Sequence, residues 1–393
     1  IPVFLFGTWI SQKIQQRWRT VAITADAGRL LVTLAFAIFL FFQGESTESR
    51  DVVFILLAAQ FLIEIGTIVF QNCRHCLIPV LYPNPEDIPR AHLWANVASL
   101  SAAAIVPLIF LTALPAGSKI QIEWLFWAAL TDASTFLISG AALLLLKNSQ
   151  RLRNLHSEVD SQSESSGNSP IRQFQQGIRT VGKYPEVLKI LIFSFLYNLL
   201  LMGPVEIGLV TFLRKDLNLP PASLAINLLV FVGGLFAGTL VANSFWKSKQ
   251  ADHLRRFSHS ILWDGITFFP ICAFAFLQDK MTYNVFLSGL CILFLLHYML
   301  VPFVRVSRLA AIQTLSNSRD WSSLLGFHSV AVEGAAAVSV VIVAFAFPES
   351  SGTLLLGAGG LGATLCGIFG IQFLKRKSKP NLDNRVHPVG ESI

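Results

Sequence analysis

The segment KNSQRLRNLHSEVDSQSESSGNSPIRQFQQGIRTVGKYP, residues 147–185, divides this chain of 393 residues into two apolar parts. Its middle is rich in serine, with six serines from Ser157 to Ser169. Few apolar residues occur between Val159 and Pro170. This composition is typical of a flexible linker. The segment therefore predicts two apolar parts joined by a polar connection.

On each side of this linker lie apolar runs long enough to cross a bilayer as helices, which takes about 20 residues each. We expect a partial span at residues 1–10 and ten full spans after it. The full spans are expected at about 22–43, 52–71, 94–115, 123–146, 187–211, 222–245, 258–278, 283–304, 322–347 and 352–374. An amphipathic piece from Phe174 to Tyr184 is expected to lie at the membrane surface.

The chain begins with Ile1 inside an apolar stretch, which we interpret as a start in the middle of a helix. Four and a half spans precede the linker and six follow it. Adding one and a half spans at the front gives six plus six. This number is typical of two-lobed secondary transporters with internal repeats.

The composition agrees with a membrane protein. Hydrophobic residues make up 53% and charged residues 13% of the chain, against about 25% charged residues in globular proteins, and the mean hydropathy is +0.59. The net charge of +7 could indicate nucleic acid as a partner. The basic residues gather in the loops, however, so anionic lipid headgroups are the expected partner and nucleic acid is not.

Basic residues alternate between the two sides of the expected spans. Of the 30 Lys and Arg residues, 23 lie in every second gap. The gaps between hold only Arg50, Lys119, Arg214, Lys215 and Lys280. This is the positive-inside pattern of a chain that crosses a bilayer many times. It places the linker and the C-terminus in the cytoplasm, in a protein of the cell (inner) membrane.

The five cysteines predict neither a disulfide framework nor a metal site. Cys73 and Cys76 form a C-x-x-C pattern, but a redox or metal role would require a thioredoxin-like context or a second pair of ligands. We interpret the pattern as a chance pair. No nucleotide-binding pattern of the Walker type occurs, and we expect no cofactor and no metal.

Several short segments, in order, resemble one transporter family. They are FQNCRHCLIP at 70–79 with AN at 95–96, ADAGR at 25–29, DASTF at 132–136, and GIR with YP within 177–185. They resemble segments of the major facilitator superfamily, and most closely its branch of macrolide-efflux proteins and the enterobactin exporter, which are of the drug:proton antiporter type. The similarity covers nearly the whole chain.

The resemblance implies an all-α polytopic membrane protein with a two-lobed six-plus-six helix transporter fold, lacking the first helix and part of the second. The expected parts are an N-terminal transmembrane lobe at 1–146 (helices 2–6), a cytoplasmic linker with an amphipathic segment at 147–185, a C-terminal transmembrane lobe at 186–376 (helices 7–12) and a cytoplasmic tail at 377–393. It implies a monomeric secondary transporter that exports an amphipathic small molecule by alternating access, driven by protons.

The sequence departs from the family at two places. Gln15 and Gln16 stand where the loop after helix 2 carries an Asp-Arg pair in the family. Val106 precedes Pro107 where antiporters have a glycine. These departures favour a second hypothesis, a degenerate, non-transporting membrane protein that acts as a subunit or sensor. A polytopic membrane enzyme ranks last, because no histidine has a convincing partner, so we predict that the chain is not an enzyme.

Five acidic residues lie inside expected spans, where a charge costs roughly 2.5–3.5 kcal/mol on insertion scales. They are Glu64, Asp132, Glu206, Asp264 and Glu333. We see no deep Lys or Arg to pair with them. Glu64 and Glu206 fall on helices that line the central cavity in the family and are the first candidates for proton or substrate binding, with Glu333 next. Asp132 and Asp264 fall on peripheral helices, where hydrogen bonds between helices are the alternative role.

Other polar residues in the spans are weaker candidates. His297 and Tyr298 are expected to face the cavity or to be packing residues. Arg305 and Arg308 end the same span and are expected to snorkel to the membrane surface.

A cytoplasmic gate is predicted at Asp26, Arg29 and Arg19. Asp26 and Arg29 are three residues apart at the cytoplasmic end of the span 22–43, close enough to pair on one helix face. The alternative is an ordinary ion pair at the surface.

Overall fold

The computed structural model describes residues 2–43, 49–82, 87–88, 90–95, 122–145, 170–220, 222–245, 253–317 and 320–373. Within these ranges every regular element is a helix. The elements, in chain order, are α1 (Pro2–Gln43), α2 (Ser49–Leu81), α4 (Ile122–Leu145), α6 (Pro170–Gly182), α7 (Pro185–Thr211), η2 (Phe212–Asp216), α8 (Ala222–Phe245), α9 (His253–Ile266), α10 (Phe268–Ala275), η3 (Gln278–Lys280), α11 (Tyr283–Tyr298), α12 (Val301–Thr314), α13 (Trp321–Ser329), η5 (Val330–Gly334), α14 (Ala335–Ala346) and α15 (Gly352–Phe373).

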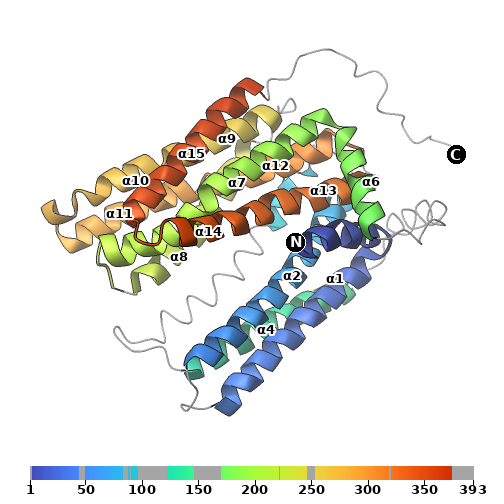
Figure 1. The fold of residues 1–393 in the computed structure, drawn as a ribbon, viewed down its shortest axis with the longest axis horizontal. Coiled ribbons are helices and arrows are strands. Elements are labelled where there is room, and N and C mark those ends of the chain that lie inside the picture. The colour runs from blue at the N-terminus through green and yellow to red at the C-terminus, as the bar shows by residue number, and fades with distance from the viewer. Residues whose placement is uncertain are drawn as a thin grey trace.

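The helices form two lobes (Figure 1). In the N-terminal lobe α1 packs along both α2 and α4, and Phe36, Leu40, Ala59 and Ala129 form a buried core between them. In the C-terminal lobe α7 packs against α14 and α15, and α15 packs against α9. The expected linker at 147–169 and the expected tail at 377–393 lie outside the described residues.

Glycines bring helices of the C-terminal lobe into close contact. A Cβ atom at Gly234 would lie 2.6 Å from the Tyr298 Cβ, and one at Gly238 would overlap the backbone of Met299. The Gly234-x-x-x-Gly238 pattern therefore lets α8 pack tightly on the end of α11, as small residues do between helices in membranes.

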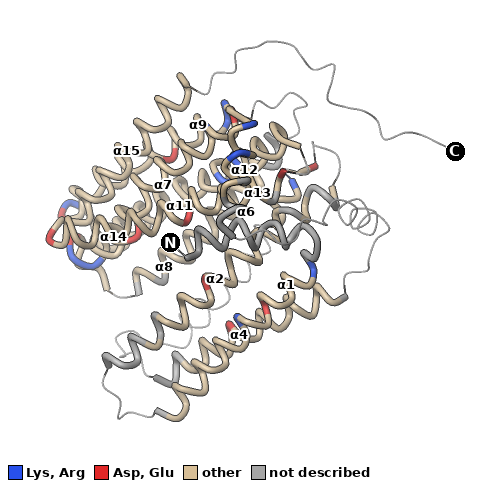
Figure 2. Tube along the Cα trace, turned by 45° about the vertical axis from the view of Figure 1, so that its right-hand side comes forward, with Lys and Arg blue, Asp and Glu red and all other residues tan. Residues whose placement is uncertain are grey.

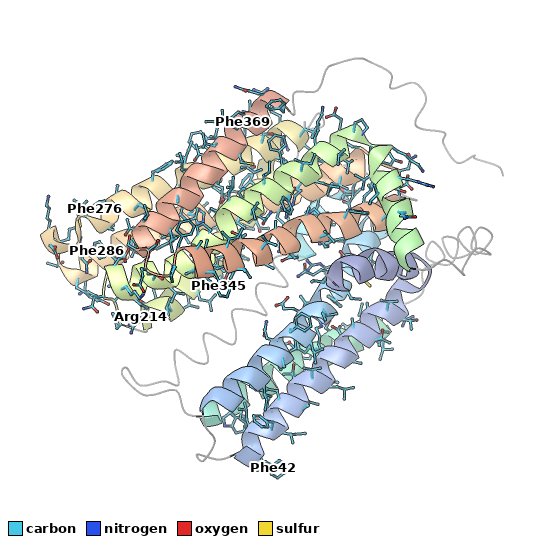
Figure 3. All side chains as sticks on the ribbon, in the orientation of Figure 1. Phe42, Arg214, Phe276, Phe286, Phe345 and Phe369 are labelled. Atoms are coloured by element: carbon cyan, nitrogen blue, oxygen red, sulfur yellow. The ribbon has the colours of Figure 1, made fainter. Side chains whose placement is uncertain are left out.

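Six helical stretches of the described part are long and apolar enough to cross a membrane by length and composition. They are Arg19–Phe42, Phe126–Leu144, Pro185–Asp216, Tyr283–Thr314, Ser323–Ala346 and Gly352–Phe373. α8 contributes a shorter apolar stretch at Ile226–Ala242, and most of the expected span 94–115 lies outside the described residues. Many large apolar side chains are exposed, among them Phe42 at 79% and Phe369 at 51%, whereas Phe286 is buried (Figure 3). Such exposed apolar surface suits contact with lipid.

One predicted break is wrong. Residues 11–19 were expected to form a loop between a partial span and the span 22–43, but α1 is helical from Pro2 to Gln43. No glycine or proline occurs between Gly7 and Gly28, and the expected loop is rich in Gln, Lys and Arg, which favour helix. A polar composition was therefore mistaken for a turn.

Two predicted spans are each divided into two helices. The span 258–278 is α9 and α10, which meet at Thr267, three residues before Pro270. The span 283–304 is α11 and α12, and the helix continues to Thr314 beyond Met299 and Leu300. Pro302 lies in the first turn of α12, where a proline starts a helix but cannot continue the preceding one.

Helix α6 agrees with the expected amphipathic piece and begins four residues earlier, at Pro170. It packs against α1 and α13, so it touches both lobes. Gly177 allows this contact, because a Cβ atom there would lie 2.6 Å from the ring of Phe327.

Candidate functional site

Glu64 and Glu333 come from opposite lobes and interact electrostatically. Glu64 lies on α2 and accepts a hydrogen bond from Gln60 Nε2 at 3.0 Å. Glu333 lies on η5, a single π-helical turn between α13 and α14. Both side chains are exposed. Such turns are rare within helices and occur often at functional sites. Here the turn carries an acid that interacts electrostatically with an acid of the other lobe.

A buried arginine lies close to the acids of the N-terminal lobe. Arg29 on α1 pairs with Asp26 one turn away, and both side chains are at most 8% exposed. Arg29 also lies within electrostatic range of Glu64 and Asp132. The expectation that no deep Lys or Arg accompanies the acids is therefore wrong.

The packing around Arg29 explains how a cation is held at this depth. Its guanidinium lies 4.7 Å from the ring centre of Phe70 and 4.5 Å from that of Phe136, an arrangement that attracts a cation to the ring face. Gly66 leaves space for it, since a Cβ atom there would lie 2.6 Å from the Arg29 Cγ. Arg29 is ten residues beyond Arg19, or about 15 Å along the helix. The alternative of a surface ion pair is therefore wrong.

The candidate gate residues make their described contacts inside the N-terminal lobe. Arg19 donates from Nε to the carbonyl of Leu143 at 3.1 Å and from Nη2 to that of Leu144 at 2.5 Å. It thereby satisfies the end of α4, where basic side chains also interact well with the helix dipole. Arg29 donates to Thr67 Oγ1 at 3.4 Å on α2. A gate at these residues stays a prediction.

The acid of the C-terminal lobe at Asp264 belongs to a buried network that joins three helices. Tyr197 of α7 donates to Asp264 Oδ2 at 2.6 Å, and His297 Nδ1 of α11 lies 3.6 Å from Asp264 Oδ1. The same nitrogen lies 2.9 Å from Thr267 Oγ1 at the junction of α9 and α10. Asp264 is 1% exposed and His297 4%, so this set holds helices together inside the lobe.

Two further candidates are placed differently. Tyr298 is 5% exposed and accepts a hydrogen bond from Asn227 of α8 at 3.0 Å. Glu206 is exposed on α7, two residues beyond Pro204. Next to this proline, the backbone N–H of Gly203 donates to Ser339 Oγ at 2.8 Å and ties α7 to α14.

The lobes are joined at the end that carries most of the basic residues. His92 Nε2 donates to Gln313 Oε1 at 3.0 Å, and Gln313 Nε2 donates to the carbonyl of His75 at 3.2 Å. Ser329 Oγ donates to Asn72 Oδ1 at 2.7 Å. We call these residues the latch. In Figure 1 the two lobes meet near α13 and α6 and diverge toward the far end of α1.

Burial changes the chemistry of two latch histidines. Both rings are nearly inaccessible, and their centres are 5.3 Å apart. Burial lowers the pKa of His92 to about 4, although the hydrogen bond to Gln313 acts to raise it. Burial and then the neighbouring Arg74 lower the pKa of His75 well below its usual value. Both rings are therefore neutral at pH 7.

Sequence reasoning missed most of this arrangement. Tyr197, Thr267 and Asn227 were not singled out, although each is a polar residue among apolar neighbours. Gln71, Asn72 and the residues that follow were noted only for their resemblance to a family. Their partners lie more than 200 residues away in the chain, for example 221 residues for His92 and Gln313, and no local signal connects them.

The comparisons with known proteins agree with this arrangement. No protein-family model and no curated protein matches the sequence. Among solved structures, the chain is similar to a bacterial homologue of the iron transporter ferroportin in an outward-facing state with soaked iron, at 12% identity and a TM-score of 0.60 over 95% of this chain and 87% of that one. It is also similar to the E. coli fucose:proton symporter FucP, at 12% identity and a TM-score of 0.61 over 95% of this chain and 90% of that one.

A third similar structure is the human organic anion transporter MFSD10, at 14% identity and a TM-score of 0.55 over 95% of this chain and 83% of that one. At these identities the likeness concerns the fold. It does not distinguish a branch, so the macrolide-efflux and enterobactin-exporter branch stays a prediction. The chain is a multi-pass membrane protein, and its described residues have the two-lobed, helical fold of these transporter structures.

Proposed function

We propose that this protein is a secondary active transporter of the major facilitator superfamily that exports an amphipathic small molecule in exchange for protons. The observation that carries this proposal is the pair of exposed acids, Glu64 and Glu333, one from each lobe. Glu333 lies ten residues into the span Ser323–Ala346, or about 15 Å deep. Acids at such depth are typical of proton and substrate pathways.

The pair offers a physical link between protonation and lobe movement. Two ionised carboxylates repel each other, and the repulsion grows as the distance between them falls. A proton on either acid removes that repulsion and favours the arrangement in which the lobes approach at this depth. Because the lobes rock against each other in alternating access, the state that holds the acids closer binds the proton more tightly. The proton can shift the equilibrium only by this difference in affinity.

Other residues have supporting roles in this proposal. Arg29 attracts Glu64 from within the N-terminal lobe, so it holds one acid in place while the other moves with its lobe. Glu206, exposed beside Pro204, is a second contact for substrate or proton. We further propose a monomer in the inner membrane whose linker and C-terminus are cytoplasmic, because the basic residues gather on that side.

The proposal is tested by transport in proteoliposomes that contain the full chain. Efflux of lipophilic dyes is measured under an imposed pH gradient, with and without a protonophore. We expect a protonophore to stop the flux, and Glu64→Gln and Glu333→Gln each to slow it and to flatten its pH dependence. Glu349→Gln is the matched control, because Glu349 is an exposed acid outside the spans. Unchanged pH dependence in both variants would overturn the role of the pair.

A second candidate is a membrane protein that no longer transports. It is favoured by the continuity of α1 through Gln15 and Gln16, where the resemblance led us to expect a gate loop with an Asp-Arg pair. A rigid helix at this position would restrict rocking of the lobes. Correctly folded protein that shows no flux for any dye, organic cation or organic anion would favour this candidate over the transporter.

A further inference from the structure

A second cluster of charges lies next to the latch, within electrostatic range of Glu333. It brings together three arginines and three histidines from both lobes. We call it the basic cluster: Arg74, His75, His92, Arg305, Arg308 and His328.

The cluster combines positive charge with burial. Arg305 and Arg308 are three residues apart on α12 and so share one face of that helix. Arg308 is 6% exposed and His328 is also 6% exposed. The expectation that Arg305 and Arg308 snorkel to the surface is therefore wrong. The helix extends to Thr314, which places both arginines well inside it rather than at its end.

The two arginines of α12 are not matched by ion-pair partners in the part of the chain that the structure describes. Within the described residues neither Arg305 nor Arg308 forms an ion pair, and the acid within their electrostatic range, Glu333, also faces Glu64. Arg74, across the lobe boundary, is repelled by Arg305, which together with burial lowers the pKa of Arg74 to about 9. Buried charges in proteins are normally paired, because removal from water is costly.

Several hydrogen-bonding atoms of the cluster are buried and unsatisfied. They are Arg308 Nε, His328 Nε2 and His75 Nδ1. These atoms come from α12, α13 and α2, so one ligand that reaches all three would touch both lobes. The guanidinium fork matches the geometry of carboxylate and phosphate oxygens.

We propose that the basic cluster binds a small oxyanion, of the phosphate or carboxylate type, between the lobes at the cytoplasmic end. Arg308 and Arg305 supply the charge from the C-terminal lobe, Arg74 supplies it from the N-terminal lobe, and the buried histidines supply neutral donors. An anion held by both lobes stabilises the closed latch. This site has Glu333 as a neighbour in common with the transport proposal, but anion binding requires neither Glu64 nor a proton gradient.

The proposal is tested with inorganic phosphate as the probe and the full chain in nanodiscs of phosphatidylcholine. The melting temperature is followed as phosphate replaces chloride at constant ionic strength. We expect a saturable rise of about 2–4 °C in the unmodified protein, and none in Arg308→Gln or Arg305→Gln. Arg179→Gln is the control, because Arg179 is an exposed arginine of α6 and should keep the full response.

Two further variants keep the test decisive if the glutamine variants fold poorly. Arg308→Lys retains the charge but loses the fork, so we expect weaker phosphate binding with an unchanged fold. Glu333→Gln removes the competing acid, so phosphate should bind roughly three- to ten-fold more tightly. The proposal is overturned if phosphate raises the melting temperature equally in all variants. It is also overturned if the unmodified protein has the same melting temperature in phosphate and in chloride.

The same assay identifies the source of the anion. Nanodiscs that also contain phosphatidylglycerol are compared with those of phosphatidylcholine alone. If the anionic lipid removes the response to phosphate in the unmodified protein, a lipid headgroup occupies the site. If the response persists, the site takes a free anion from the cytoplasm.

Discussion

The polar contacts inside each lobe differ in kind from those between the lobes. Inside the lobes they include buried bonds to carboxylates, such as the Asp26–Arg29 pair and the Tyr197–Asp264 hydrogen bond, beside neutral bonds. Between the lobes they are mostly bonds among neutral amide, imidazole and hydroxyl groups. Hydrogen bonds to charged groups contribute about 1.5–3 kcal/mol each, against about 0.5–1.5 kcal/mol for neutral ones. Each lobe is therefore built to stay rigid, and the latch to open.

Charged residues are also distributed unevenly along the helices. Figure 2 shows the described Lys and Arg residues gathered mainly near the ends of the helices of the C-terminal lobe. The basic cluster and the pair Glu64 and Glu333 are the ionisable groups that the structure describes at the lobe boundary, and a bound anion would offset part of the charge of the cluster. With the anion in place, the positive charge of the three arginines is partly compensated, so closing the latch buries less unpaired charge.

The largest expected effect comes from breaking the buried pair inside the N-terminal lobe. Arg29→Met keeps the length of the side chain but leaves Asp26 buried without its cation. Removing one partner of a buried pair costs about 3–5 kcal/mol. We expect a large fall in the melting temperature of the purified protein. The double variant Arg29→Met with Asp26→Leu should recover most of the loss, because it no longer buries Asp26 without its cation. A double variant as unstable as the single one would contradict this explanation.

The next effect concerns the latch and pH. His92 has a pKa of about 4 in the closed latch and an ordinary value near 6.5 when the latch is open and the ring is in water. Above about pH 6.5 the ring is neutral in both states, so the latch has its full stability. As the pH falls from 6.5 toward 4, the open state binds a proton that the closed state does not. The latch then weakens by about 1.4 kcal/mol per pH unit, or about 3 kcal/mol in total.

The groups that face His92 act in the same direction. Arg74 and Arg305 repel a proton on its ring, and Leu93, Ala242 and Val306 form an apolar cluster next to it. The measurement is hydrogen–deuterium exchange of the ends of α2 and α12. We expect protection to fall below pH 6.5 in the unmodified protein and to fall less in His92→Gln, compared at equal pH. If protection falls equally in the unmodified protein and in His92→Gln, a group other than His92 titrates in this pH range.

Some of this architecture follows from sequence and some does not. The apolar runs and the alternation of basic residues predict a polytopic two-lobed protein. Each span must satisfy its backbone hydrogen bonds internally, and each loop lies on one side of the membrane. The break between α11 and α12 near Pro302 was missed because a proline inside an apolar run still permits insertion. The course of α1 was missed because a polar stretch without turn residues is compatible with a helix as well as a loop.

The candidate site was predicted only in part. Depth in a span is enough to single out Glu64 and Glu333, since an ionisable residue there is costly. Depth does not reveal that they face each other across the lobes, because that depends on packing between residues about 270 positions apart in the chain. Arg29 was assigned to a helix end because the helix was expected to start too late. Asn72 and Ser329 meet across 257 residues, and nothing local in either segment predicts the other.

The smallest expected effect comes from one neutral bond of the latch. Ser329→Ala removes the donor to Asn72 Oδ1 and leaves the hydrogen bonds inside each lobe intact. The loss of about 0.5–1.5 kcal/mol should raise the open fraction of the latch by roughly 2- to 13-fold. Exchange at the ends of α2 and α12 should speed up by that factor, while the melting temperature changes little. Ser351→Ala is the control, because Ser351 lies at the start of α15, far from the latch in the chain. If Ser329→Ala instead lowered the melting temperature as much as Arg29→Met, the bond between the lobes would be part of the rigid structure, and the distinction between the lobes and their boundary would fail.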